Sequence, residues 1–236
     1  MTSNNFSSGH QVPLDENWTL IAVLCDRSGS MTALNPENTA KQVNDLVHEQ
    51  RGGKVTVTFS TFSDQYEVIK TNVDGKEFSI TKDDIKPEGP TALQESLCRM
   101  IDDIGKELSD MTVSRPGKVV FIVLTDGQEN ASSGKYSGEQ GRKLLSEKIK
   151  HQQEVYKWIF YFLGTNIDAI NTGASYGIDT RTCINYGNSE LGCTNVMRSA
   201  SNALNRVRFA SDTISRNEML ESGGFTQDER LNSQQT

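Results

Sequence analysis

The sequence predicts a three-layer α/β fold with a doubly wound, mostly parallel sheet of six strands, one antiparallel edge strand, and helices on both faces. Apolar runs and amphipathic segments alternate along most of the 236 residues. The runs 119–124 and 158–163 have almost no polar alternation, which is typical of strands buried on both faces of a parallel sheet. Only three residues separate 54–62 from 66–73, too few for a crossover helix, so these segments should form an antiparallel hairpin.

The elements are expected in the order β α β β α β α β α β α. The strand candidates are apolar or β-branched runs, at residues 18–25, 54–62, 66–73, 119–124, 157–163 and 181–186. The helix candidates show apolar residues at steps of three and four or turn signals at their ends, at residues 38–51, 93–108, 139–152, 166–176 and 196–207. We expect the hairpin of residues 54–72 at one edge of the sheet.

The chain is expected to form one domain over residues 17–215, with a flexible extension at each end. Residues 1–16 are rich in Ser, Asn and Gly, and residues 216–236 end in SGGFTQDERLNSQQT. Such polar segments bury too little apolar surface to offset the entropy of ordering.

Composition excludes several classes of function. The formal net charge is −7, and the sequence has no basic stripe of the kind that a nucleic-acid backbone requires. Arginines gather only near the end of the domain, which we interpret as a solvated helix face. No segment approaches 18 consecutive apolar residues and no signal peptide is evident, so we expect a cytoplasmic protein without a membrane span. The four scattered cysteines lack CxxC spacing and are expected to be free thiols.

Small oxygen-bearing residues follow two of the predicted strands. Asp26, Ser28 and Ser30 come directly after the first strand, and Asp126 follows the run 119–124. Ligands of open α/β sheets gather beyond the carboxyl ends of the strands. If the two strands are neighbours at the centre of the sheet, the two carboxylates face each other, which is unfavourable unless a cation lies between them. Oxygen ligands of this kind suit Mg²⁺, with Mn²⁺ as a possible substitute.

Thr91 is a candidate for a third hydroxyl ligand, in the loop that opens the predicted helix 93–108. Its structural alternative is the T-x-x-Q capping box formed with Gln94, in which the hydroxyl caps the helix and needs no metal. The alternative for Asp26, Ser28 and Ser30 is an Asx or Ser turn that closes a strand. For Asp126 it is a type I turn at Asp-Gly.

DxSxS after a first strand, a loop threonine before a helix, and TDG after a later buried strand together resemble the von Willebrand factor A (vWA) domain and its metal-ion-dependent adhesion site. The matching positions are Asp26, Ser28, Ser30, Thr91 and Asp126, and the resemblance runs from about residue 17 to about 215. VLCDRSGSM is most similar to stand-alone bacterial and phage members. The resemblance implies a Rossmann-like fold and a Mg²⁺ held directly by the serines, and by the threonine in one state, with the aspartates acting largely through water.

The resulting hypothesis is a non-catalytic protein-interaction module whose Mg²⁺ takes a Glu or Asp carboxylate of a protein partner. One alternative is a structural or assembly component of a larger complex, for instance of a phage particle. Another is a partner of an AAA+ ATPase, as stand-alone bacterial relatives often are. The less favoured enzyme alternative is a Mg²⁺-dependent phosphatase with Asp26 as nucleophile. That chemistry normally needs a second carboxylate two residues on, where Ser28 stands.

Overall fold

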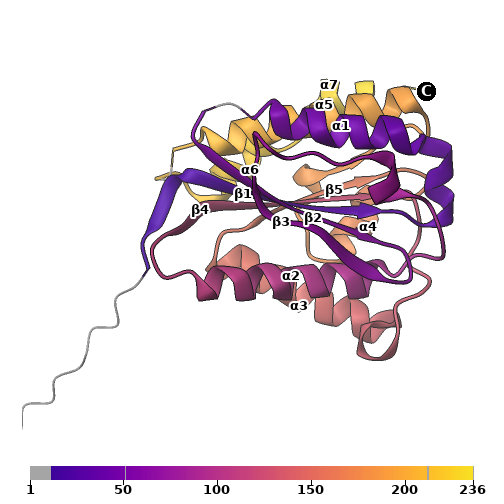
Figure 1. The fold of residues 1–236 in the computed structure, drawn as a ribbon, viewed down its shortest axis with the longest axis horizontal. Helices are drawn as coiled ribbons and strands as arrows, with labels where there is room; N and C mark the ends of the chain where they lie inside the picture. The colour runs from indigo at the N-terminus through magenta and orange to yellow at the C-terminus, as the bar shows by residue number, and fades with distance from the viewer. Residues whose placement is uncertain (1–11, 51, 212, 236) are drawn as a thin grey trace, which may run out of the picture.

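A six-stranded sheet forms the centre of the computed structural model, which describes residues 12–50, 52–211 and 213–235 (Figure 1). The strand order is β3-β2-β1-β4-β5-β6, and only the pair β2 and β3 is antiparallel. The strands are β1 (Leu14–Asp26), β2 (Lys54–Phe62), β3 (Tyr66–Asp74), β4 (Arg115–Thr125), β5 (Ile159–Gly164) and β6 (Cys183–Asn185). The predicted fold class is confirmed, including the antiparallel hairpin at one edge.

Helices cover both faces of the sheet and give the molecule three layers (Figure 1). One face carries α1 (Pro36–His48) and α5 (Glu190–Arg208), and the other carries α2 (Leu93–Asp110), α3 (Gly138–Val155) and α4 (Ala169–Ser175). Short 3₁₀ helices lie in the described connections: η1 (Gly29–Leu34), η2 (Lys82–Ile85), η3 (Gly134–Tyr136) and η4 (Thr180–Thr182). No helix in the described part of the chain is long and apolar enough to cross a membrane.

The central strand β1 explains why the apolar runs lack polar alternation. Ile21 and Val23 pack into the core beneath α1 and α5, while Leu20 and Leu24 pack into the core beneath α2 and α3. Successive side chains of a strand point to opposite faces, so a strand covered on both faces must be apolar at every position.

The register of β1 and β4 sets the position of the two predicted aspartates. The strands run parallel, and Cys25 pairs with Leu124. Asp26 and Asp126 therefore leave the sheet at the same edge, beyond the carboxyl ends of neighbouring central strands, as the sequence predicted.

The C-terminal segment differs from the flexible tail expected for residues 216–236. Its described residues form α6 (Arg216–Gly223) and α7 (Gln227–Ser233), which pack against α5. Two buried apolar residues, Leu220 and Phe225, anchor it, and Ser215 and Thr226 begin the two helices with capping boxes. Sparse apolar anchors inside a polar segment are too few to show helical periodicity. The expected N-terminal extension falls mainly on residues 1–11, which lie outside the described residues.

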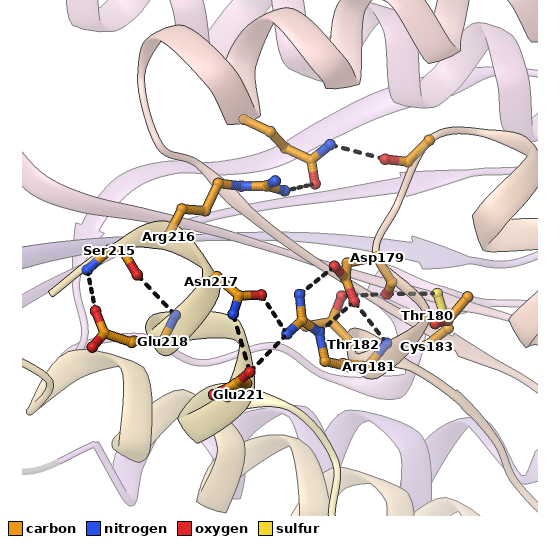
Figure 2. Close-up of polar contacts among 12 residues, drawn as sticks. Asp179, Thr180, Arg181, Thr182, Cys183, Ser215, Arg216, Asn217, Glu218 and Glu221 are labelled. Atoms are coloured by element: carbon orange, nitrogen blue, oxygen red, sulfur yellow. Dashed lines mark hydrogen bonds and ion pairs between the residues drawn. The ribbon is translucent and has the colours of Figure 1, made fainter.

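Polar contacts fasten α6 to the turn before β6 (Figure 2). Arg181 lies in η4, and Asp179 is the N-cap of that helix. The Arg181 guanidinium donates to both carboxylate oxygens of Asp179, at 2.9 and 2.8 Å. The same guanidinium donates to Asn217 Oδ1 at 2.9 Å and lies 3.9 Å from the Glu221 carboxylate, both on α6. This arginine therefore links the edge of the sheet to the C-terminal segment.

Arg206 on α5 fixes the segment a second time. Its guanidinium donates two hydrogen bonds to the Glu229 carboxylate on α7, both at 2.9 Å, and others to the carbonyls of Ser222 and Gly224. The Glu229 side chain is only 12% exposed. This arginine is thus an internal anchor and does not belong to the solvated helix face that we expected from the sequence.

We predict that Arg206→Ala lowers the free energy of unfolding by about 2 kcal/mol, because it leaves a mostly buried carboxylate without its guanidinium partner. Lys150→Ala is the control, since it removes an exposed pair with Glu154 and should cost less than about 0.5 kcal/mol. Urea denaturation measures both losses. Equal losses in the two variants would contradict the anchoring role.

Candidate metal-ion site

The carboxylate of Asp26 organises the loop that follows β1. Its Oδ1 accepts a hydrogen bond from the Ser28 backbone N–H at 2.7 Å, and its Oδ2 accepts one from the Thr125 hydroxyl at 2.6 Å. Asp26 is only 1% exposed. Each oxygen of this carboxylate is thus engaged by the protein, one by its own loop and one by the last residue of β4.

Three of the other predicted residues lie in one hydrogen-bonded chain. The hydroxyls of Ser28 and Ser30 are 3.1 Å apart, and the Ser30 hydroxyl donates to Asp126 Oδ1 at 2.7 Å. Ser28 and Asp126 are buried, whereas Ser30 is exposed. The loop after β1 and the loop after β4 therefore present their oxygens to each other.

Thr91 joins this group through its contact with Gly127. A Cβ atom added to Gly127 would lie 2.8 Å from Thr91 Oγ1 and 3.6 Å from Ser30 Oγ, so both hydroxyls border the same small space. The structure contradicts the alternative in which Thr91 caps the following helix. The N-cap residue of α2 is Ala92, whose side chain forms no capping hydrogen bond. The Thr91 hydroxyl makes no hydrogen bond with any residue that the structure describes.

Glu129 takes over the capping role that the alternative interpretation gives to Thr91, and Asn130 holds the Thr91 backbone. The Glu129 carboxylate accepts from the Gln94 N–H at the start of α2 and from the Ala131 and Ser132 N–H groups of its own loop. Asn130 Oδ1 accepts from the Thr91 N–H at 2.8 Å, and the Asn130 N–H donates back to the Thr91 carbonyl. These residues position the threonine.

Sequence reasoning missed three residues that organise the site. Thr125 belongs to the TDG motif but is not among the predicted ligands, and Glu129 and Asn130 follow that motif. A position within the TDG motif or just after it is the one sequence signal that marks these three residues.

Burial makes negative charge costly in this site, and neither Asp26 nor Asp126 forms an ion pair with a residue that the structure describes. Asp126 Oδ2 is buried and has no hydrogen-bond partner among the described residues. Desolvation, reinforced by the nearby Asp26 carboxylate, raises the pKa of Asp126 to about 6 despite the hydrogen bond from Ser30. Desolvation also raises the pKa of Asp26, against the hydrogen bonds from Thr125 and Ser28. A buried carboxylate oxygen without a partner is costly, and a cation would remove that cost.

The donor set suits a hard divalent cation. The described residues contain no cluster of three or more His, Cys, Asp or Glu side chains placed to hold a metal. The predicted site is of another kind, because it combines hydroxyl oxygens with carboxylates, the ligands that Mg²⁺ accepts alongside water. The structure brings Asp26, Ser28, Ser30, Thr91 and Asp126 together. Their assignment as metal-binding residues stays a prediction.

Solved structures with the same fold include several vWA domains. The vWA protein of Catenulispora acidiphila is 13% identical, with a TM-score of 0.55 over 80% of this chain and 43% of its own. The vWF domain of the type V pili tip protein Mfa5 from Porphyromonas gingivalis is 8% identical, with a TM-score of 0.57 over 86% of this chain and 98% of its own. Proximal thread matrix protein 1 of the mussel byssus, solved with a zinc-occupied MIDAS motif, is 18% identical with a TM-score of 0.52, over 78% of this chain and 44% of its own.

The chain thus has the fold of a vWA domain, and the predicted resemblance is confirmed at the level of the fold. The chain spans less than half the length of the Catenulispora acidiphila protein and of the mussel protein. No family model matches the sequence, and no curated protein shows significant similarity to it.

We predict that Gly127→Ala weakens Mg²⁺ binding by about 10- to 100-fold, since the added methyl group would displace the Thr91 hydroxyl. Gly105→Ala is the matched control, because a Cβ at this position inside α2 meets no atom within 4 Å. That control should keep its Mg²⁺ affinity and gain about 0.5 to 1 kcal/mol of stability. Titration calorimetry and urea denaturation measure the two effects. Unchanged Mg²⁺ affinity in Gly127→Ala would exclude Thr91 from the metal site.

We predict that Asp126→Asn stabilises the metal-free protein at neutral pH. Because the folded pKa of Asp126 is raised to about 6, the folded state binds more protons than the unfolded state between about pH 4 and pH 6. The free energy of unfolding of the wild-type protein in chelator therefore falls as the pH rises through this window. Asp126→Asn has no titrating group at this position, so its free energy of unfolding should fall less. The two proteins should be most alike at about pH 4.

Saturating Mg²⁺ should reverse the order at neutral pH, since the ion stabilises the wild-type folded state by RT ln(1 + [L]/Kd) and the variant has lost the charge that attracts it. Urea denaturation at several pH values, with Mg²⁺ and with chelator, measures both effects. A variant that gains as much from Mg²⁺ as the wild-type protein would remove Asp126 from the site.

Proposed function

We propose that this chain is a Mg²⁺-dependent protein-interaction module that binds an Asp or Glu side chain of a partner protein and catalyses no reaction. Ser28, Ser30, Thr91 and Asp126 would hold the ion, and Asp26 would fix the loop that carries the serines. The observation that carries the proposal is the buried Oδ2 of Asp126, which lies beside a group of hydroxyls and has no hydrogen-bond partner in the described part of the chain.

The neutral hydroxyls define the chemistry of recognition. When bound, a divalent cation with few anionic protein ligands would keep an open position that attracts an anionic oxygen. Ser30 is exposed at the rim of the site, so the partner would approach from this side. The vWA fold supports the proposal, since one similar structure is described with an occupied MIDAS motif.

The geometry around Asp26 argues against the phosphatase alternative. A nucleophilic carboxylate needs an oxygen that can reach phosphorus, but each Asp26 oxygen accepts a hydrogen bond and the residue is 1% exposed.

The free, buried thiols of all four cysteines agree with the proposed cytoplasmic location.

Panning of a peptide-display library tests the interaction. The library carries one fixed glutamate among random neighbours, and bound peptides are released with chelator. We predict that a recovered peptide loses measurable binding when its glutamate is replaced by glutamine, which removes the charge but keeps the shape. Ser30→Ala should weaken binding by about tenfold or more through loss of a ligand. Ser109→Ala, at the far end of α2, should have no effect. Recovery of peptides that bind equally well in chelator would reject the proposal.

An assay with an aryl phosphate separates this function from catalysis. We expect no Mg²⁺-dependent turnover above background, because the Asp26 carboxylate is buried and each of its oxygens accepts a hydrogen bond from the protein. Hydrolysis that requires Mg²⁺ and disappears in Asp26→Asn would establish the enzyme alternative instead.

A further inference from the structure

A small polar cavity of about 170 Å³ lies beside the candidate metal site. Three segments form its walls: the turn between β2 and β3, the first turns of α2, and the loop after β4. Two of its wall residues connect it to Thr91. Ala92 is the next residue in the chain, and the Ala131 N–H donates to the Thr91 carbonyl. A ligand that reaches the proposed ion would therefore lie next to this cavity.

Among the described residues, one carboxylate of the cavity wall has no cationic partner. Glu95 is neutralised by Arg99, whose Nε and Nη2 both donate to Glu95 Oε1. Asp64, by contrast, accepts only the Ser63 hydroxyl at 3.2 Å and forms no ion pair with any residue that the structure describes. The charges of Asp64, Glu95 and Arg99 thus sum to one negative charge in the cavity wall.

One residue that lines the cavity, Ser96, has a hydroxyl without a partner among the described residues. Ser96 is 1% exposed, and its Oγ is buried without a hydrogen bond to any described residue. An apolar occupant would leave this hydroxyl unsatisfied. An anionic occupant would meet the Asp64 carboxylate. A cationic occupant matches both groups, since an ammonium or guanidinium donates hydrogen bonds to a hydroxyl oxygen and to a carboxylate.

We propose that this cavity receives a basic side chain, lysine or arginine, of the same partner whose acidic side chain binds the ion. This inference rests on the proposed function and narrows the partner to a protein segment with an acidic and a basic residue at a fixed spacing. The ion would select the acid, and Asp64 with Ser96 would select the base.

The peptides recovered by panning provide the first test. In the wild-type protein, lysine or arginine should be enriched at one offset from the fixed glutamate. Panning against Asp64→Asn should abolish that enrichment and still yield peptides that depend on Mg²⁺ and on glutamate. Asp64 is exposed, so its substitution should leave the fold intact.

A synthetic peptide from the enriched set then gives a double-mutant cycle. Replacing its basic residue by methionine should weaken binding to the wild-type protein by about tenfold, and binding to Asp64→Asn by much less. Asp110→Asn, at the other end of α2, removes the same charge far from the cavity and should behave like the wild-type protein. The variant therefore separates local pairing from the overall charge of the molecule.

The outcomes distinguish the two proposals. Peptides that need Mg²⁺ and glutamate but show no basic enrichment would reject the cavity proposal and leave the interaction module standing. The cavity proposal is also rejected if replacing the basic residue of the peptide by methionine weakens binding to the wild-type protein and to Asp64→Asn by the same factor. If no peptide depends on Mg²⁺ and glutamate, both proposals are rejected.

Discussion

The parallel pairing of β1 with β4 at the centre of the sheet is the constraint on which the candidate site depends. It brings two aspartates to the same edge, and the hydrogen bond of 2.6 Å from Thr125 to Asp26 ties the two strand ends together. Burial raises the pKa of both carboxyl groups. The fold therefore concentrates negative charge at a place where desolvation makes it costly, and a bound cation would compensate for it.

Backbone hydrogen bonds extend this order to the surrounding loops. The Gly29 N–H donates to the Gly89 carbonyl, which links the loop after β1 to the loop before α2. The Ala92 N–H donates to the Ser63 carbonyl, which links the start of α2 to the turn between β2 and β3. The candidate metal site and the neighbouring cavity are thus built from the same loops. These backbone hydrogen bonds fix the distance between the candidate metal site and the cavity. A fixed distance is what the two proposed sites would need to bind two side chains of one partner at a defined spacing.

The sequence predicts the sheet well because the strands in its centre are apolar on both faces, and it predicts the aspartates because each directly follows such a run. It predicts the tail poorly, since two buried side chains, Leu220 and Phe225, anchor a segment that is otherwise polar. The alternative in which Thr91 caps α2 is also wrong. Glu129 lies 35 positions from Gln94, whose N–H it accepts, so the cap depends on tertiary structure that local patterns do not record.

This distant cap has a chemical consequence for Thr91. A threonine that capped its own helix would use its hydroxyl to accept a backbone hydrogen bond, and that lone pair would compete with metal binding. Because the Glu129 carboxylate and the Ser132 hydroxyl satisfy the Gln94 and Glu95 N–H groups, the helix needs nothing from Thr91. Asn130 holds the Thr91 backbone in place from both sides. The loop after β4 therefore contributes Asp126 and also leaves the threonine hydroxyl available beside it, so one loop prepares two of the proposed ligands.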